Sequence, residues 1–412
     1  MSKPNVSGVQ RRTLRLLAIA QIFSGIGVGA VVSTGSLLAV QLSGSEAWAG
    51  SVTTTMTLGA AFASAFLLRI AVEHGRRRSL ATGLLLGAIG AVTVVIAAVT
   101  NFFPILLVAG LLVGFGNAVN LQARFAATDL SKPNHRSRDL SLIMWMSTIG
   151  SVAGPNLIAT GERVAGVVQV PPLAGIFVLS AIAVFIATAL IWFGLKPDPY
   201  LLRAELSGET AKPTRESSSV KTGLRSLWRY TGARVGFVHI ISAHAVMVAI
   251  MSMTPVHMVA HGAEVTLVGL TVSLHIAGMY ALSPLMGWLT DRFGGQFIAQ
   301  IGQVTLLASG VLAAFSGASH ALTLVALILL GLGWSAATVA GASLIVKHVP
   351  TNEAVGAQGA SDTFMSLAGA LGGLLAGVIL GWIGYFGLGL IAAAISLAVI
   401  VRYVSHLVRR LV

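Results

Sequence analysis

The sequence predicts an all-α integral membrane protein with twelve transmembrane helices in two pseudo-symmetric six-helix bundles. Three observations lead to this expectation. First, 55% of the 412 residues are hydrophobic and only 9% are charged, whereas soluble proteins carry about 25% charged residues. Second, the apolar residues form twelve runs that are long enough to cross a bilayer, which takes about 20 residues of helix. Third, the longest polar stretch divides these runs into six and six.

The twelve predicted spans follow one another along the whole chain. Because a bilayer offers no water to backbone groups, each run is expected to be helical. Pro155 is expected to bend the fifth helix. The runs lie near residues 14–40, 47–70, 79–99, 104–127, 139–160, 173–195, 233–256, 265–289, 296–317, 321–346, 355–381 and 385–405.

The polar stretch runs from Lys196 to about Arg229 and is rich in Pro, Ser, Glu and Lys. Its composition predicts partial disorder, with a short interfacial helix over 224–230 that places Trp228 at the lipid headgroups. The expected organisation is an N-terminal six-helix bundle over 1–195, a cytoplasmic linker over 196–232 and a C-terminal six-helix bundle over 233–412.

The net charge of +13 is distributed as an orientation signal. With the N-terminus inside, Lys and Arg gather in or beside every segment predicted to be cytoplasmic, and Arg163 is the only basic residue expected outside. The distribution argues against nucleic acid as a partner and predicts that both termini are cytoplasmic. The chain has no cysteine, so neither a disulfide nor a thiolate ligand can form.

A signature follows the second span of each half. After the eighth span its glycines and charges are Gly287, Asp291, Arg292 and Gly294. The copy after the second span is weaker, because Leu68 and Val72 stand at the positions of the first glycine and the aspartate, with Glu73 a substitute charge. Two parallel six-helix halves, a cytoplasmic linker and this signature resemble the major facilitator superfamily (MFS) of secondary transporters. The resemblance implies the MFS fold and a gating role for the signature.

Two adjacent spans carry matched pairs of soft metal ligands. Met247 and Met251 lie four residues apart in the seventh span, and His275 and Met279 lie four apart in the eighth. Side chains at this spacing share one face of a helix. The two pairs are equally distant from the loop centre near Ala263, so antiparallel helices would bring all four to matched depths near mid-bilayer. Thioether and imidazole ligands suit Cu(I) better than Mg, Ca or Mn. The alternative is that the methionines fill gaps at a helix interface.

This double motif, Met-x-x-x-Met followed by His-x-x-x-Met in the next span, resembles the CcoA-type copper importers within the superfamily. The resemblance implies that the four residues are required for copper uptake in the bacterial cytoplasmic (inner) membrane. It also implies a cytoplasmic copper acceptor and a role in cytochrome c oxidase assembly. Some members of that family use cysteines, which this chain lacks. A sister group transports riboflavin and lacks the Met/His pairs, which keeps an organic substrate open.

Further ligand-type side chains surround the two pairs. Met253, His257 and His261 recur every four residues toward the outer end of the seventh span, and His244 lies one turn before Met247. One interpretation is a relay that captures copper at the mouth and passes it inward. The other is that the outer histidines are solvated, that His239, deeper in the span, only hydrogen-bonds a carbonyl, and that His244 likewise has a structural role.

Asp362 is the only acid placed clearly within a span, where acids are rare and usually functional. It is interpreted either as a protonation switch that couples transport to the proton gradient or as a structural brace of the eleventh span. Arg124 and Asp129, at the inner end of the fourth span, are expected to pair and to lock a gate.

The sequence contains no hydrolytic constellation and no Walker-type loop, so the protein is predicted not to be an enzyme and not to use ATP. No cofactor is expected, because copper would be the substrate, and a monomer in the lipid bilayer is expected. Three functions stay open. A copper importer is favoured over a proton-coupled transporter of a small organic solute, which would be a drug or metabolite exporter or a riboflavin-like uptake system. The third is a membrane copper sensor or assembly factor that does not transport.

Overall fold

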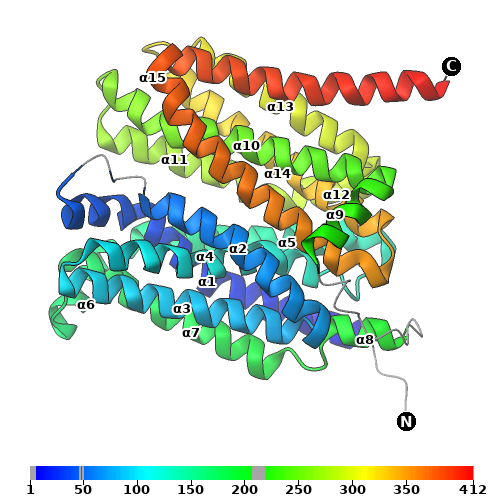
Figure 1. Ribbon diagram of the computed structural model, residues 1–412, viewed down its shortest axis with the longest axis horizontal. Coiled ribbons are helices and arrows are strands. Elements are labelled where there is room, and N and C mark those ends of the chain that lie inside the picture. Colours follow the sequence, from blue (N-terminus) through cyan, green and yellow to red (C-terminus); the bar gives the residue numbers. More distant parts are fainter. Residues whose placement is uncertain (1–5, 46–47, 49–50, 207–218, 412) are drawn as a thin grey trace. The chain divides into compact units, whose positions relative to one another are not determined.

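The computed structural model describes residues 6–45, 48, 51–206 and 219–411, and every regular element in these ranges is a helix (Figure 1). Contacts divide the chain into two compact units, which are described separately below. Unit 1 comprises Met1–Ser226 and Val349–Thr363, and unit 2 comprises Leu227–His348 and Phe364–Val412. The segment Val349–Thr363 therefore packs with helices that lie far from it in the sequence.

The helices of unit 1 come almost entirely from the first half of the chain, with the start of α15 added. They are α1 (Val6–Ser43), α2 (Ser51–His74), α3 (Arg76–Thr100), α4 (Phe103–Ala126), α5 (Arg136–Asn156), α6 (Ile158–Val168), α7 (Gly175–Gly194), α8 (Pro199–Leu206) and most of α9 (Val220–Arg229), with 3₁₀ turns at Pro133–His135 and Pro172–Ala174.

The helices of unit 2 come from the second half of the chain. They are α10 (Thr231–Ala260), α11 (Val265–Tyr280), α12 (Ser283–Phe293), α13 (Gly295–Ala314), α14 (His320–His348) and the remainder of α15 (Thr351–Leu411).

Ten helical stretches within the described residues are long and apolar enough to cross a membrane. The tenth, Thr351–Arg402, covers the last two predicted spans as far as Arg402, and Gly384 separates them with a positive φ of 68°. The predicted fifth span is helical but is divided at Leu157, two residues after Pro155, into α5 and α6. These helices confirm the predicted all-helical, multi-pass membrane fold.

The polar segment after α7 forms helices at both of its ends. Asp198 begins α8, because its Oδ1 accepts hydrogen bonds from the backbone N–H groups of Tyr200 at 3.0 Å and Leu201 at 3.3 Å. The short helix predicted over 224–230 is found as the second half of α9, with Trp228 44% exposed. The disorder predicted for this segment falls in part on residues 207–218, which lie outside the described residues.

A glycine with positive φ ends the second long helix of each half. Gly75, at φ 87°, separates α2 from α3, and Gly294, at φ 92°, separates α12 from α13. Each donates its N–H to the carbonyl four residues earlier at 3.0 Å. Because residues with a Cβ rarely adopt this backbone conformation, glycine is required at both turns.

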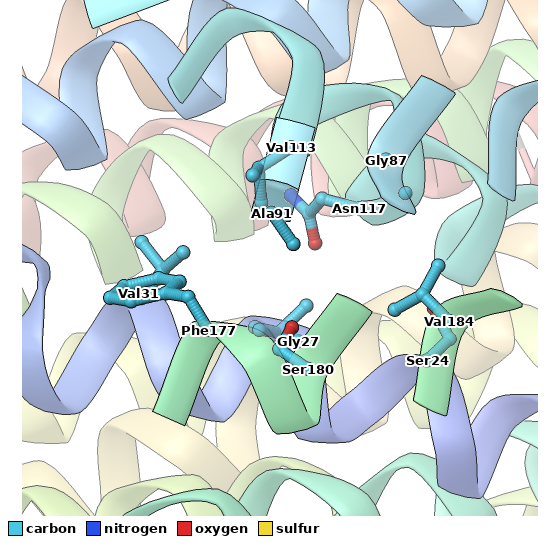
Figure 2. A pocket seen from close by; sticks show the side chains of 12 residues that line it. Ser24, Gly27, Val31, Gly87, Ala91, Val113, Asn117, Phe177, Ser180 and Val184 are labelled. Atoms are coloured by element: carbon cyan, nitrogen blue, oxygen red, sulfur yellow. The ribbon is translucent and has the colours of Figure 1, made fainter. Parts of the chain in front are cut away.

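Unit 1 has a small cavity between α1, α3, α4 and α7 (Figure 2). Ser24, Asn117 and Ser180 face it, together with glycines that let the helices approach closely. Its volume of about 10 Å³ is far below the roughly 300 Å³ at which pockets for organic ligands begin. This cavity is therefore too small to be a binding site for an organic solute.

Candidate functional site

The Met/His pairs lie inside two helices of unit 2. Met247 and Met251 belong to α10, and His275 and Met279 belong to α11. His275 is fully buried, and Met247 and Met279 are 4% and 6% exposed, whereas Met251 is half-buried. The i, i+4 spacing therefore lies on continuous helix in both cases. Three of the four side chains have little or no exposure, as an internal site requires.

His275 is held by the backbone of a third helix. Its Nδ1 donates a hydrogen bond of 2.9 Å to the carbonyl of Leu327 in α14. This fixes the neutral tautomer, which leaves the lone pair on Nε2. Nε2 is buried and has no hydrogen-bond partner among the described residues. Metal-ligating histidines typically anchor one ring nitrogen to a carbonyl in this way and coordinate through the other.

α14 is the common support of the two ligand-bearing helices. Both α10 and α11 pack extensively on α14, and they touch each other much less. Gly331 permits the approach of α11, because a Cβ at this position would collide with the carbonyl oxygen of His275. Small residues at such crossings let helix backbones come close in membranes. The ligand pairs are thus placed by their packing on α14 more than by direct contact between α10 and α11.

Trp334 of α14 connects the levels of the two pairs. Its indole Nε1 donates to Nδ1 of His244 at 3.1 Å, and its ring lies edge-on to Tyr280 at a centroid distance of 5.6 Å. Met247 follows His244 by one turn of α10, and Met279 immediately precedes Tyr280 on α11. Trp334 thus contacts residues next to both pairs, and the matched depths and convergence of the four side chains on one ion stay predictions.

His244 accepts a hydrogen bond from Trp334, which bears on whether this histidine has a structural role or a role in a metal relay. Because its Nδ1 lone pair accepts the indole N–H of Trp334, the ring proton of a neutral His244 must be on Nε2. In this arrangement His244 offers no lone pair to a metal ion. This contact supports the structural interpretation of His244.

The outer histidines separate into one buried and one exposed residue. His257 is 8% exposed, donates Nε2–H to the carbonyl of Gly317 at 2.9 Å and stacks on Tyr385 with centroids 4.1 Å apart. His261 is exposed, and its Nδ1 donates to the carbonyl of His257 at 2.8 Å. Met253 is half-buried. His257 therefore holds α10 to its neighbours, while His261 and Met253 remain the candidates for a capture step.

Among the described residues, no group of three or more His, Asp or Glu side chains could hold a metal ion. The four proposed copper ligands are three methionines and one histidine, so they would not form a group of three His, Asp or Glu side chains.

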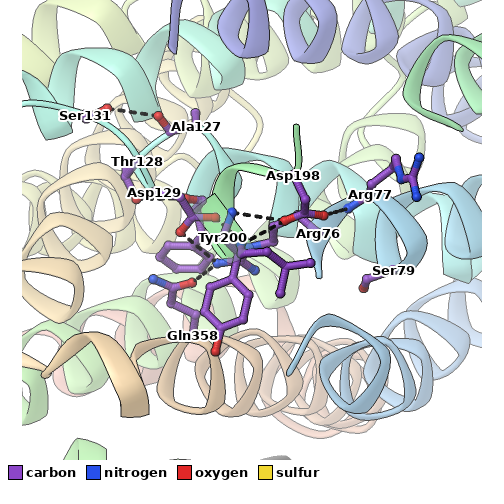
Figure 3. A network of polar contacts seen from close by, with 12 residues as sticks. Arg76, Arg77, Ser79, Ala127, Thr128, Asp129, Ser131, Asp198, Tyr200 and Gln358 are labelled. Atoms are coloured by element: carbon purple, nitrogen blue, oxygen red, sulfur yellow. Dashed lines mark hydrogen bonds and ion pairs between the residues drawn. The ribbon is translucent and has the colours of Figure 1, made fainter. Parts of the chain in front are cut away.

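Two buried ion pairs lie among the described residues of unit 1, and they differ from the expected one. The Nη2 of Arg124 lies 2.6 Å from Oδ1 of Asp362, and both side chains are at most 1% exposed. Asp129 instead accepts a hydrogen bond of 2.9 Å from Nε of Arg76, which also contacts Gln358 (Figure 3). The expected pairing of Arg124 with Asp129 is wrong. Asp129 lies in the turn beyond the end of α4, so it does not share a helix face with Arg124.

The partner of Asp362 was missed because it is distant in the sequence. Asp362 lies in the part of α15 that belongs to unit 1, next to α4. Arg76 was also missed, because it belongs to a run of three arginines at the predicted cytoplasmic side, and nothing in that run indicates which of them is buried. Trp334 could have been identified from the sequence as a residue with a polar partner, because an indole N–H in an apolar helix needs a hydrogen-bond acceptor.

The signature residues after the eighth predicted span cluster at the end of α12. Gly287 is buried, whereas Asp291 and Arg292 are exposed, and the Arg292 guanidinium lies 5.4 Å from the ring centre of Trp288. In the weaker copy, Leu68 is buried and packs on Gly359, where an added Cβ would lie 2.8 Å from the Leu68 side chain. The two copies thus share the glycine turn but differ in packing.

A family model described as the Major Facilitator Superfamily matches residues 17–265 and 235–410. This chain belongs to the major facilitator superfamily. It is 38% identical over 391 residues to YdeG of Bacillus subtilis, an MFS-type transporter, with 95% of this chain and 90% of the relative covered. The riboflavin transporter RfnT of Brucella anthropi is 28% identical, with 90% of both chains covered. This superfamily member is a secondary transporter, and such proteins are generally not enzymes.

Solved structures of superfamily transporters share the fold. The proton:xylose symporter XylE matches with a TM-score of 0.75 over 96% of this chain and 95% of its own, at 14% sequence identity. At this identity the likeness establishes the fold alone. It agrees with the multi-pass helical architecture described above.

Proposed function

We propose that this superfamily member imports copper ions through the Met/His pairs of α10 and α11. The state of His275 is the observation that carries the proposal. Its Nδ1–H is fixed on the Leu327 carbonyl, and its Nε2 is buried without a hydrogen-bond partner in the described part of the chain. Buried polar atoms of this kind are uncommon and call for an explanation, such as a ligand that uses the lone pair. A soft cation fits this role.

The chemistry of the ligand set favours Cu(I) as the substrate. Met247 and Met279 are buried and supply thioether sulfur, which is a soft ligand that Mg, Ca and Mn do not prefer. All members of the proposed set are neutral, so a cation would be held by coordination without an opposing charge. A transport site must bind its ion strongly enough to accept it and weakly enough to release it.

Energy coupling is assigned to the Arg124–Asp362 pair. An acid buried inside a transmembrane bundle is a candidate proton carrier. Protonation of Asp362 would remove one charge of a buried pair and weaken its attachment to Arg124. The movement of α15 relative to α4 would then depend on the proton. This step would connect the proton gradient to the first part of α15, which belongs to unit 1.

The cellular setting follows from the resemblance to CcoA-type importers. We place the protein in a bacterial inner membrane as a monomer, with both termini in the cytoplasm. A cytoplasmic copper acceptor would receive the ion and supply cytochrome c oxidase assembly. The sidedness is supported by the clustering of basic residues in the segments that face inward under this topology.

A second candidate function is transport of a small organic solute. Two observations favour it: the relationship to the riboflavin transporter RfnT, and the aromatic pair Trp334–Tyr280 beside His244. Aromatic side chains and a few polar groups are the usual lining of sites for flat organic ligands. Under this alternative the buried methionines would fill gaps at helix interfaces.

Uptake by reconstituted vesicles tests the proposal. Purified protein is placed in vesicles that contain a Cu(I) chelator, and entry of radioactive copper is measured. We compare the wild type with the double variant Met247→Leu/Met251→Leu and with Met144→Leu, a buried methionine of unit 1. Met-to-Leu changes conserve volume, so all three proteins should fold. The double variant should lose at least about tenfold in uptake, whereas the control should not.

The same vesicles separate the three functions. Copper entry that the double variant abolishes supports the importer. Copper binding by the wild type without entry would instead identify a sensor or assembly factor. Entry of radioactive riboflavin without entry of copper would establish the organic-solute alternative, and in that case the double variant should behave like the control.

A further inference from the structure

A groove opens on the outer surface of unit 1, between α3 and α7. Its wall is mostly apolar and includes Leu85, Phe185, Thr188, Ala189, Trp192 and Phe193. Its volume is about 360 Å³, which exceeds the roughly 300 Å³ at which ligand pockets begin. Trp192 is 44% exposed and Phe193 is 71% exposed, so the groove faces the surroundings of the bundle. In a membrane protein these surroundings are lipid acyl chains.

One end of this groove is basic. α3 begins at Arg76 and α7 ends at Gly194, and the arginines lie at the start of α3. The guanidinium of Arg77 lies 5.6 Å from the ring centre of Trp192, which itself lines the groove. Arg78 is exposed beside it. An apolar channel with a cation at one end matches the shape and charge of a lipid with an anionic head.

In the described part of the chain, the Asp198 carboxylate forms no ion pair with the guanidinium groups of Arg77 and Arg78 at this basic end. Asp198 accepts the backbone N–H of Arg77 at 2.7 Å and the backbone N–H groups that begin α8. Figure 3 shows the Arg77 side chain directed away from the Asp198 carboxylate. Glu73 contacts His74 at 3.9 Å. Among the described residues, no ion pair joins a carboxylate to the guanidinium of Arg77 or Arg78. Their charge remains available to a ligand.

We propose that the α3/α7 groove binds an anionic phospholipid, with one acyl chain along Leu85, Phe185 and Trp192 and the phosphate at Arg77. Guanidinium groups form paired hydrogen bonds with phosphate oxygens, and a ring stacked beneath Arg77 holds the guanidinium in place. A neutral lipid would leave the charge of Arg77 unmatched. A free phosphate ion would leave the apolar groove unfilled. The complete site therefore fits an anionic phospholipid.

Photo-crosslinking gives a readout that is confined to this groove. The purified full-length protein is incubated with phosphatidylglycerol that carries a photoreactive group in one acyl chain, and a phosphatidylcholine probe serves as the neutral comparison. After illumination, labelled peptides from α7 are quantified by mass spectrometry. The phosphatidylglycerol probe should label the α7 residues that line the groove more strongly than the phosphatidylcholine probe does.

Two variants test the two halves of the site, and each has a matched control. Arg77→Gln removes the cation and should lower labelling of α7 by about fivefold, the effect expected of one arginine near an anionic surface. Arg12→Gln makes the same change at an exposed position of α1 and should not alter labelling. Ala189→Phe fills the groove and should also reduce labelling, whereas Ile186→Phe, on the exposed face of α7 outside the groove lining, should not.

Either of two results would overturn the proposal. Equal labelling by the two probes would show that charge plays no part. Unchanged labelling in Arg77→Gln and Ala189→Phe would show that lipid contacts α7 without using the groove. All five proteins remain comparable, because each change lies on the outer surface and monodispersity in detergent is checked first. Copper uptake is not part of the readout, so this test is independent of the proposed function.

Discussion

The interiors of the two units differ in the chemistry of their buried polar groups. Unit 1 holds full charges: Arg124 with Asp362, and Arg76 with Asp129, all of them at most 2% exposed as side chains. In unit 2 the buried polar groups that carry the hydrogen bonds described here are imidazole, indole, amide and hydroxyl groups, as in the contact of His275 with the Leu327 carbonyl.

Buried ion pairs and neutral buried imidazole groups suit different roles in a transporter. Breaking a buried ion pair leaves a desolvated charge, so such a pair favours one arrangement of helices strongly over others. A neutral imidazole with an available lone pair can bind a soft ligand without a large rearrangement of charge. Under the proposed function, unit 1 would control the conformation and unit 2 would coordinate the substrate. The predictions below test this division.

The largest effect on stability is expected in unit 1. Asp362→Leu leaves the Arg124 guanidinium buried without its carboxylate and should destabilise the protein by about 3–5 kcal/mol. The double variant Arg124→Leu/Asp362→Leu removes both charges and should recover most of this loss. Unfolding in mild detergent measures both values. Equal destabilisation of the single and double variants would mean that the pair is not the source of the effect.

The largest effect on transport is expected in unit 2. His275→Ala removes the proposed Nε2 ligand and should lower copper uptake by about 100-fold. His239→Ala is the matched control, because both ring nitrogens of His239 are engaged, with the Val235 carbonyl at 2.8 Å and the Gln300 amide at 3.2 Å. Uptake in vesicles is measured for both, after normalisation to protein content. Equal losses in the two variants would remove His275 from the site.

Coupling to protons should reside in unit 1 alone. Asp362→Asn keeps an acceptor for Arg124 but cannot exchange a proton. Wild-type uptake should therefore change with pH, while residual uptake by the variant should not, and equilibrium copper binding should be retained. If wild type and variant show the same pH profile, Asp362 is a structural brace and uptake is driven by copper trapping inside.

A smaller effect is expected at the outer end of α10. The double variant Met253→Leu/His261→Ala leaves His257 and its stack on Tyr385 in place. If these residues capture copper, the concentration for half-maximal uptake should rise by about fivefold, as for the loss of about 1 kcal/mol, with the maximal rate unchanged. An unchanged concentration dependence would exclude the capture role.

The smallest effect is expected for a neutral hydrogen bond of unit 2. Trp334→Phe removes the indole N–H that contacts His244 and should destabilise the protein by about 1 kcal/mol, far less than Asp362→Leu. Thermal unfolding compares the two variants directly. A loss as large as that of Asp362→Leu would contradict the division between a charged and a neutral interior.

Much of the fold could be predicted because its signals are local. Apolar runs of spanning length identify helices, since a chain in lipid has few other ways to satisfy its backbone. Gly294 marks the turn after α12 because only glycine adopts its φ readily. The spacing of Met247 and Met251 places both on one helix face, and this requires no knowledge of neighbouring helices.

The partners of buried groups were decided by the tertiary structure. The sequence places Arg124 near Asp129, yet packing brings Arg124 to Asp362 and Asp129 to Arg76. It also could not show that Trp334 would take the lone pair of His244. Helical periodicity fixes which residues share a face, but it carries no information on which other helix that face meets. That choice depends on close packing between segments far apart in the chain, and it determines which charges pair and which lone pairs stay available.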